Sequence, residues 1–313
     1  MTKISIIIPC YYNEENIPVT TAALLENERL FPEDLEFEYV MVDDGSKDRT
    51  LEALLTFEKQ NPGKVKIVKL VANVGSYNAI VAGMETATGD CNVVITADLQ
   101  DPPELMVKMY EYWKNGVKLV IANREEREEG FFKSLFANSF QYLMKHFALS
   151  NLPEGGFDYV LFDKRIREEV VSMKEKNTNC LYLMIWLGYD YVSIPYRRAE
   201  RKLGKSRWTL TKKLKLFVDS FVSFSFLPIR AITFLGFILG FLALGYGLFV
   251  ALAKASGLVE LSGWSSMMMV VLFVSSFQMI SIGVLGEYLW RALDASRNRP
   301  NYLIDKVFHT QKS

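Results

Sequence analysis

The chain has 313 residues, balanced formal charge, two histidines and three cysteines. This length allows one large or two modest domains. The charge balance argues against a general polyanion binder, so nucleic acid is not an expected partner. The few histidines argue against histidine acid–base or metal chemistry. Cys10, Cys91 and Cys180 are widely spaced and lie mostly in apolar runs, which indicates reduced core residues facing the cytosol rather than a disulfide framework or a zinc site.

The N-terminal part of the chain alternates short β-rich runs with helical patterns. Strands are predicted at residues 3–8, 37–42, 65–71, 92–96 and 117–122, and helices at 17–30, 49–60, 76–87 and 104–114. Near-continuous apolar strands separated by helices predict a parallel sheet covered on both faces. Ligands bind beyond the carboxyl ends of the strands in such sheets. Polar residues follow three strands, at 9–16, 43–46 and 98–101, and their convergence predicts a nucleotide site.

The segment at residues 93–104 reads V-V-I-T-A-D-L-Q-D-P-P-E, a buried strand that ends abruptly in acids and an amide. Asp98 and Gln100 are two apart, so on an extended chain both side chains point to the same side. Their oxygen atoms suit Mg²⁺ or Mn²⁺, and Mg²⁺ usually takes one or two protein ligands besides phosphates and waters. The alternative is that Asp101 and the two prolines after it simply cap the next helix.

Two uncharged runs, at residues 231–253 and 261–286, are each long enough to cross the roughly 30 Å hydrocarbon core of a membrane. Their outer flanks are basic, which places both flanks and the N-terminal part in the cytoplasm by the positive-inside rule. The alternative is a buried helical hairpin in a soluble core. Arg230 and Glu287 lie at the cytoplasmic ends of the spans and are predicted to anchor them, with an Arg230–Glu287 ion pair as a second reading.

Residues 208–226 interleave lysines with aromatic and aliphatic residues just before the first span. This pattern predicts an amphipathic helix lying on anionic headgroups. A solvated linker helix is the alternative.

Several motifs together resemble a known family. They are P-C-Y-Y-N-E-E-N at 9–16, V-D-D-G-S at 42–46, N-x-G at 73–75, A-x-G-D at 87–90 and A-D-L-Q-D-P-P-E at 97–104. They are similar to inverting GT-A glycosyltransferases, and within these to polyprenyl-phosphate glycosyltransferases. G-E-Y-L-W-R at 286–291 and R-P-N-Y at 299–302 resemble the tail of the bacterial branch with two C-terminal spans. The resemblance covers nearly the whole chain.

The resemblance implies an α/β fold with a GT-A, Rossmann-like nucleotide-sugar-binding domain at residues 1–207. An amphipathic juxtamembrane helix would follow at 208–226. Two transmembrane helices would lie within 227–290, at about 229–253 and 262–287, followed by a cytoplasmic tail at 291–313. The protein would be a multi-pass protein of the inner or plasma membrane, with its catalytic domain and both termini cytoplasmic. The family suggests a homo-oligomer, a tetramer.

The implied activity is inverting transfer of one sugar from a nucleotide sugar to polyprenyl phosphate at the cytoplasmic leaflet, for cell-envelope glycan modification. The bacterial branch favours a UDP-sugar, undecaprenyl phosphate and Mg²⁺ or Mn²⁺. One alternative is a transferase with a lipid or other hydroxyl acceptor. A second is a non-catalytic or weakly active nucleotide-sugar-binding partner of a membrane glycan or flippase complex. It is suggested by Thr96 and Val160, where the family has aspartate and arginine.

The resemblance also implies site residues. The nucleotide would be bound by Pro9, Tyr11, Glu14, Asp43, Asp44, Ala97 and Asp98. Asp44 would accept hydrogen bonds from a base edge or ribose, whereas the alternative for residues 43–46 is a helix-capping turn. Asp98 and Gln100 would hold the metal that offsets the charge of the departing diphosphate.

Asp158, in G-G-F-D-Y-V-L-F-D at 155–163, matches the family's general base. A lipid phosphate is already anionic, so Asp158 is expected mainly to orient it or to take one residual proton. In the alternative, Asp158 and Asp163 are ordinary strand-end and helix-capping acids. Basic side chains suit phosphate oxygens. The phosphate and acceptor contacts are predicted at Arg124, Arg127, Arg201, Lys205, Ser206 and Arg207.

Overall fold

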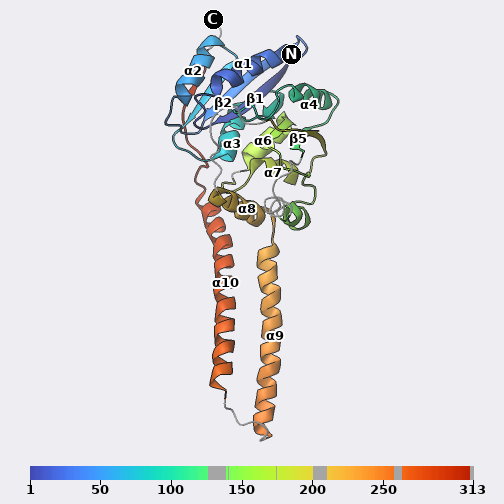
Figure 1. The fold of residues 1–313 in the computed structure, drawn as a ribbon, viewed down its shortest axis with the longest axis vertical. Helices are drawn as coiled ribbons and strands as arrows, with labels where there is room; N and C mark the ends of the chain where they lie inside the picture. The colour runs from blue at the N-terminus through green and yellow to red at the C-terminus, as the bar shows by residue number, and fades with distance from the viewer. Residues whose placement is uncertain (126–138, 140, 174, 200–209, 257–262, 311–313) are drawn as a thin grey trace. The chain divides into compact units, whose positions relative to one another are not determined.

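The computed structural model describes residues 1–125, 139, 141–173, 175–199, 210–256 and 263–310 (Figure 1). The chain divides into two compact units. The first comprises Met1–Ser220 and Arg299–Ser313, and the second comprises Phe221–Asn298. The first unit holds the sheet, and the second holds two long helices.

The described strands form one sheet in the order β7-β5-β6-β4-β1-β2-β3-β8. Their bounds are β1 Thr2–Cys10, β2 Leu35–Asp43, β3 Val65–Leu70, β4 Cys91–Val94, β5 Leu119–Arg124, β6 Tyr159–Asp163, β7 Tyr191–Tyr196 and β8 Ile304–Phe308. The α/β fold class is confirmed, but the prediction of a parallel sheet is wrong at two strands. β6 runs antiparallel to both β4 and β5, and β8 runs antiparallel to β3. An antiparallel neighbour needs no helical crossover, so the strand–helix alternation does not reveal it.

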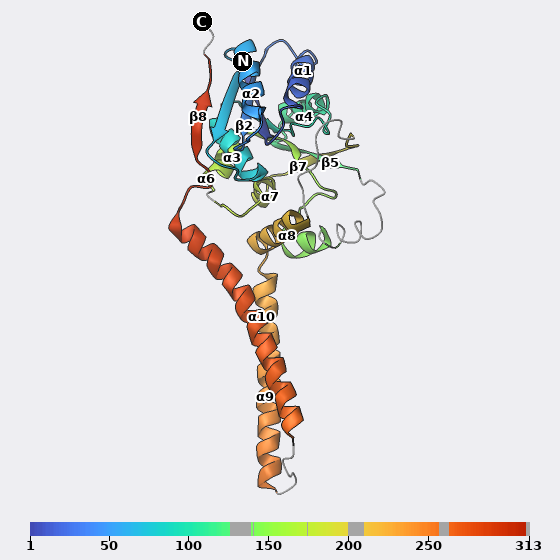
Figure 2. The ribbon, with the colours of Figure 1, turned by 60° about the vertical axis from the view of Figure 1, so that its left-hand side comes forward.

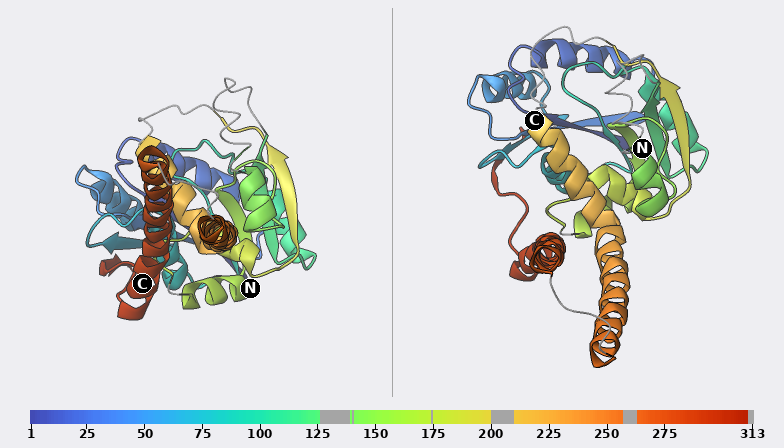
Figure 3. Two further views of the ribbon diagram at one scale, coloured as in Figure 1. Left: turned by 90° about the horizontal axis from the view of Figure 1, so that it is seen from below. Right: turned by 60° about the horizontal axis from the view of Figure 1, so that its bottom comes forward.

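Helices cover both faces of the sheet (Figure 3). Their bounds in the first unit are α1 Ile17–Glu28, α2 Thr50–Gln60, α3 Ser76–Thr86, α4 Leu105–Lys114, α6 Lys164–Ser172 and α7 Cys180–Trp186. Successive strand residues point to opposite faces. Ile6 and Ile8 therefore join Leu24 of α1 and Leu54 of α2 in one buried cluster. Ile7 faces α3, where an added Cβ on Gly83 would lie 2.5 Å from its Cγ2 atom.

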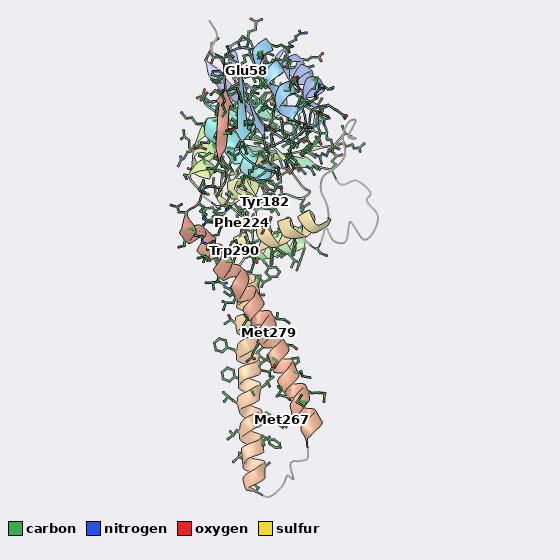
Figure 4. The ribbon with its side chains drawn as sticks, turned by 90° about the vertical axis from the view of Figure 1, so that its left-hand side faces the viewer. Glu58, Tyr182, Phe224, Met267, Met279 and Trp290 are labelled. Atoms are coloured by element: carbon green, nitrogen blue, oxygen red, sulfur yellow. The ribbon has the colours of Figure 1, made fainter. Side chains whose placement is uncertain are left out.

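The C-terminal residues, predicted as a tail, form the edge strand β8 (Figure 2). The Thr310 amide donates to Glu58 Oε1 of α2 at 2.6 Å, and Figure 4 labels Glu58. The Tyr302 hydroxyl donates to Glu85 Oε2 of α3 at 2.6 Å. The end of the chain is therefore part of the first unit.

The second unit contains α9, Leu227–Ala255, and α10, Trp264–Arg297. Each includes an apolar stretch with mean hydropathy 2.1 and exposed side chains, at Leu227–Val250 and Met267–Arg297. Met267 and Met279 of α10, which Figure 4 labels, are among these exposed side chains. Such exposure is expected of lipid-facing helices and not of a buried hairpin, so these helices indicate membrane association.

Two polar contacts lie near one end of α10. The Glu287 carboxylate pairs with Arg291, 2.9 Å away and one turn further along α10. Tyr288 donates to the carbonyl of Ser225, 2.8 Å away, in the short connection before α9. The partner that the structure gives Glu287 is therefore Arg291 and not Arg230. Before this connection, α8 spans Leu210–Phe224, within the segment predicted as an amphipathic helix.

Candidate functional site

Several strand ends meet at one edge of the sheet. Cys10 at the end of β1 lies opposite Asp43 at the end of β2, and Arg124 at the end of β5 lies opposite Tyr196 at the end of β7. Because β6 runs antiparallel to its neighbours, its first residue, Tyr159, lies at the same edge. The sheet thus brings the predicted polar segments together with the residue before β6, Asp158.

The segment after β1 is fastened to the segment before α2. Tyr12 adopts a left-handed conformation with φ of 54°, and its amide donates to Ser46 Oγ at 3.1 Å. The Arg49 amide donates to Glu14 Oε2 at 2.8 Å. Glu14 therefore holds the start of α2, a role that its motif did not reveal.

The other two predicted residues of this segment lie beside the turn. Pro9 lies opposite Val42 in the register of β1 and β2. The Tyr11 amide donates to Asn13 Oδ1 at 2.8 Å, and its ring packs edge-on against Tyr12 with centroids 4.7 Å apart. The register of β1 thus places Pro9, and the turn places Tyr11.

Asp43 ends β2 and is buried. Its Oδ1 accepts a hydrogen bond from the Ser46 amide at 3.0 Å. Burial raises the pKa of Asp43 above its ordinary value, although the Ser46 hydrogen bonds oppose this effect. Asp43 therefore holds the turn at residues 43–46 but does not cap α2, whose N-cap residue is Arg49.

Asp44 is also buried and organises the loop before α3. Its carboxylate accepts from Asn73 Nδ2 at 2.7 Å, from the Val74 amide at 2.7 Å and from the Gly75 amide at 3.1 Å. These contacts use three of about four acceptor positions of a carboxylate. Burial raises the pKa of Asp44 to about 6 despite the two backbone hydrogen bonds. Asp44 thus combines a fixed orientation with an unusually basic carboxylate.

The acidic segment after β4 is a turn. β4 ends at Val94, and Leu99 is left-handed with φ of 50°. The expectation that Asp98 and Gln100 lie on an extended chain is therefore wrong, because the residues between Val94 and Gln100 form a turn. Gln100 Nε2 donates to the Ala199 carbonyl at 3.2 Å. The turn is also tied to α1, since Thr20 Oγ1 donates to the carbonyl of Ala97 at 2.8 Å.

The alternative for Asp101, that it merely caps the next helix, is wrong. The N-cap residue of α4 is Glu104, without a capping side-chain hydrogen bond. Asp101 is instead completely buried and accepts hydrogen bonds from the Tyr196 hydroxyl and from Thr96 Oγ1. Arg198 Nε lies 3.3 Å from Asp101 Oδ1. Neither Tyr196 nor Arg198 belongs to the sequence motifs around Asp98, so sequence patterns gave no signal of this contact.

Asp158 forms an ion pair with Arg124. Burial alone would lower the pKa of Arg124, but the nearby Asp158, Tyr196 and Asp101 raise it above its ordinary value. The loop before Asp158 packs closely on the same strand end. An added Cβ on Gly155, whose φ is 74°, would lie 2.6 Å from the Arg124 carbonyl oxygen.

Two tyrosines missed by the sequence interpretation lie near Asp158. Burial and the charge of Asp158 raise the pKa of Tyr77 in α3, and the same two causes raise that of Tyr182 in α7 to about 12. Tyr182 is labelled in Figure 4. Asp163 does cap a helix as the alternative proposed, because its Oδ1 accepts from the Arg165 amide at 2.9 Å. Val160 is completely buried in β6.

The donor set at the turn fits a hard cation. The described residues contain no group of three or more His, Cys, Asp or Glu side chains arranged for a metal. The predicted ligands Asp98 and Gln100 offer a carboxylate and an amide oxygen, which are donors of the kind that Mg²⁺ takes in proteins. The remaining predicted phosphate contacts lie outside the described residues: Arg127, Arg201, Lys205, Ser206 and Arg207.

Comparison with known proteins identifies similar sequences. Residues 5–171 match the model of glycosyl transferase family 2. An uncharacterised glycosyltransferase of Synechocystis is 34% identical, covering 98% of this chain and 96% of that protein. A prophage bactoprenol glucosyl transferase homolog of Escherichia coli is 32% identical over 97% of this chain and 99% of that protein. A bactoprenol glucosyl transferase of Shigella phage SfII is 32% identical over 97% and 98%, respectively.

Proposed function

Because the chain belongs to glycosyl transferase family 2, we propose that this glycosyltransferase moves one sugar from a UDP-sugar onto undecaprenyl phosphate. The similarity to bactoprenol glucosyl transferases over nearly the whole chain carries this proposal. The two exposed apolar helices support it, because an acceptor with a polyprenyl tail resides in the membrane.

The nucleotide is proposed to bind at the ends of β1 and β2. Asp44 offers about one remaining carboxylate acceptor position to an N–H of the base or a hydroxyl of the ribose. Asp43, Glu14 and the Ala97 carbonyl hold the surrounding turns through the hydrogen bonds described above. Pro9 and Tyr11 complete the proposed base pocket. Rigid turns of this kind limit the entropy lost when a ligand binds.

Asp98 and Gln100 are proposed to hold Mg²⁺ or Mn²⁺. When bound, the cation would act as a Lewis acid that offsets negative charge on the nucleoside diphosphate. The protein residues supply oxygen ligands and a turn that is fixed through Ala199 and Ala97.

Asp158 and Arg124 are proposed to receive the acceptor phosphate. A phosphate oxygen attacks the anomeric carbon and forms the new C–O bond. The bond between that carbon and the diphosphate oxygen breaks on the opposite side, with inversion. The nucleoside diphosphate leaves with the bonding electrons. Arg124 is held by Asp158, and its guanidinium suits phosphate oxygens. Asp158 orients the acceptor or takes its residual proton.

The proposed topology places residues 1–207 and both termini in the cytoplasm, with residues 208–226 on the membrane surface and residues 227–290 forming a two-helix hairpin. Lysines and arginines flank the outer ends of both apolar stretches, as the positive-inside rule requires. Residues 304–308, in the C-terminal segment after the second apolar stretch, pair with β3. The C-terminus is therefore proposed to lie on the same side of the membrane as the sheet domain. The proposal includes a homo-oligomer, a tetramer, in the inner or plasma membrane.

The test uses the purified full-length chain in detergent with a short polyprenyl phosphate and a panel of nucleotide sugars. We expect metal-dependent release of nucleoside diphosphate together with a glycosylated lipid. A variant with Asp98→Asn serves as the matched inactive control. Sugar transfer to a hydroxyl acceptor but not to the phosphate would support the alternative transferase. Nucleotide-sugar binding without any product would support the non-catalytic alternative.

A further inference from the structure

Three side-chain oxygen atoms, from Thr96, Asp98 and Asp101, lie in a hydrogen-bonded row at the proposed metal site. Thr96 Oγ1 lies 2.9 Å from Asp98 Oδ1 and 2.7 Å from Asp101 Oδ2. A threonine hydroxyl carries one hydrogen, so it donates to one carboxylate at a time. Its position between both acids nevertheless links the partly buried Asp98 to the fully buried Asp101.

Asp101, at the buried end of this row, is held by several contacts. Asp101 is completely buried, and a buried carboxylate is stable only when it is paired and hydrogen-bonded. The Tyr196 hydroxyl donates to its Oδ1, and Arg198 Nε lies 3.3 Å from the same oxygen. Tyr196 ends β7, so Asp101 is attached to the sheet itself.

The outer end lies on the turn. The Gln100 amide lies 3.4 Å from Asp98 Oδ1, at the long limit for a hydrogen bond. Thr96 Oγ1 is closer to the same oxygen, at 2.9 Å. Leu99, the next residue, adopts a strained left-handed conformation, so the Thr96 contact helps to fix where the Asp98 carboxylate lies on this turn.

We propose that Thr96 is a positioning residue that ties Asp98 to the buried anchor formed by Asp101 and Tyr196. This inference rests on the proposed role of Asp98 as a metal ligand. Groups that hydrogen-bond to a metal ligand orient it, and their loss typically costs about 10- to 100-fold in metal affinity or activity. A neutral hydroxyl also fastens Asp98 without placing a third negative charge beside the two carboxylates.

The experiment compares Thr96→Val, which replaces the hydroxyl by a methyl group of similar size, with Thr96→Ser, which keeps the hydroxyl. Thr86→Val is the matched control, because the hydroxyl of this partly buried threonine donates to the Ala82 carbonyl of its own helix, 3.0 Å away, and not to a site residue. Mn²⁺ binding to the full-length protein with UDP is measured by electron paramagnetic resonance. Sugar transfer is measured separately across Mn²⁺ concentrations.

For Thr96→Val we expect Mn²⁺ affinity to fall about tenfold or more, with turnover recovering at high Mn²⁺. Thr96→Ser and Thr86→Val should bind Mn²⁺ as the unmodified protein does. Equal Mn²⁺ affinity for Thr96→Val and the unmodified protein overturns the inference, and so does equal impairment of the valine and serine variants. No Mn²⁺ binding by the unmodified protein instead overturns the metal assignment in the proposed function.

Thermal unfolding checks that each variant is folded. Tyr196→Phe provides a second route if Thr96→Val does not fold, because it removes one donor to Asp101 and leaves Thr96 in place. A smaller loss of Mn²⁺ affinity is expected for this variant. Unchanged Mn²⁺ affinity in Tyr196→Phe would contradict the role of Asp101 as the anchor.

Discussion

Glu38 of β2 is a buried carboxylate whose loss should destabilise the sheet domain measurably. It accepts hydrogen bonds from Ser5 Oγ at 2.5 Å, the Thr88 amide at 2.8 Å and Thr88 Oγ1 at 2.9 Å. Lys66 Nζ lies 2.8 Å and Lys3 Nζ 3.3 Å from Oε1. Burial by itself raises the pKa of Glu38, but the bonds from Lys66, Ser5 and Thr88 lower it to about 2.

The lowered pKa of Glu38 gives the size of the expected loss of stability. A change from 4.5 to about 2 stabilises the charged form in the folded state by about 3 kcal/mol, at about 1.4 kcal/mol for each tenfold change in proton affinity. Because the folded-state pKa is the lower one, this stabilisation is present above pH 4.5 and is lost as the pH falls toward 2. Glu38→Gln should therefore lower the free energy of unfolding by about 3 kcal/mol at pH 7.

Thermal unfolding of the full-length protein in detergent, at pH 7 and at pH 4 and below, measures this effect. Glu36→Gln is the matched control, because Glu36 lies on the same strand and is exposed. The melting temperature of Glu38→Gln should be well below that of Glu36→Gln at pH 7, and this difference should become smaller at pH 4 and below. Equal melting temperatures at pH 7, or a gap that does not narrow, would refute the reasoning.

Further predictions concern the site. Asp98→Asn should reduce turnover more than Asp158→Asn, because an anionic acceptor phosphate needs little deprotonation; equal losses with intact donor binding would contradict this ranking. Removal of divalent cations by a chelator should stop product formation, and unchanged turnover would exclude the metal assignment. Since the pKa of Asp44 is about 6, the fraction of protein with a deprotonated, hydrogen-bond-accepting Asp44 increases as the pH rises through 6. Donor KM should therefore fall between pH 5 and 7, and Asp44→Asn should raise KM and remove this dependence. Gly155→Ala should cost about 1–3 kcal/mol in a melting experiment and lower kcat, because its left-handed backbone and the nearby Arg124 carbonyl leave no room for a methyl group.

The convergence of the polar segments at one sheet edge could be predicted from sequence, because it depends on a general property of α/β sheets. Polar residues directly after apolar strands identify the edge that binds ligands. The structure brings Cys10, Asp43 and the turn at Asp98 to that edge. The order of the strands could not be predicted, because the pairing of β6 with β4 and of β8 with β3 depends on contacts between distant parts of the chain.

Asp101 shows why local patterns also fail within the site. Followed by two prolines, it has the sequence of a helix start. Its actual partner, Tyr196, is 95 residues away in sequence. Val160 shows the same limit, because the family motif suggested a polar contact whereas the fold buries this position between β4 and β5.

The backbone conformations that local propensity disfavours lie mainly at this site. Among the described residues other than glycine, a positive φ occurs at Tyr12, Leu99 and Asn298. Tyr12 lies on the turn after β1, and Leu99 lies between the two proposed metal ligands. Each such residue costs on the order of 1–3 kcal/mol and persists only where the surroundings enforce it. The bonds from Tyr12 to Ser46 and from Gln100 to Ala199 provide that enforcement. These hydrogen bonds therefore hold both turns in conformations that a relaxed chain would not adopt, and those conformations set where the polar groups of the turns lie.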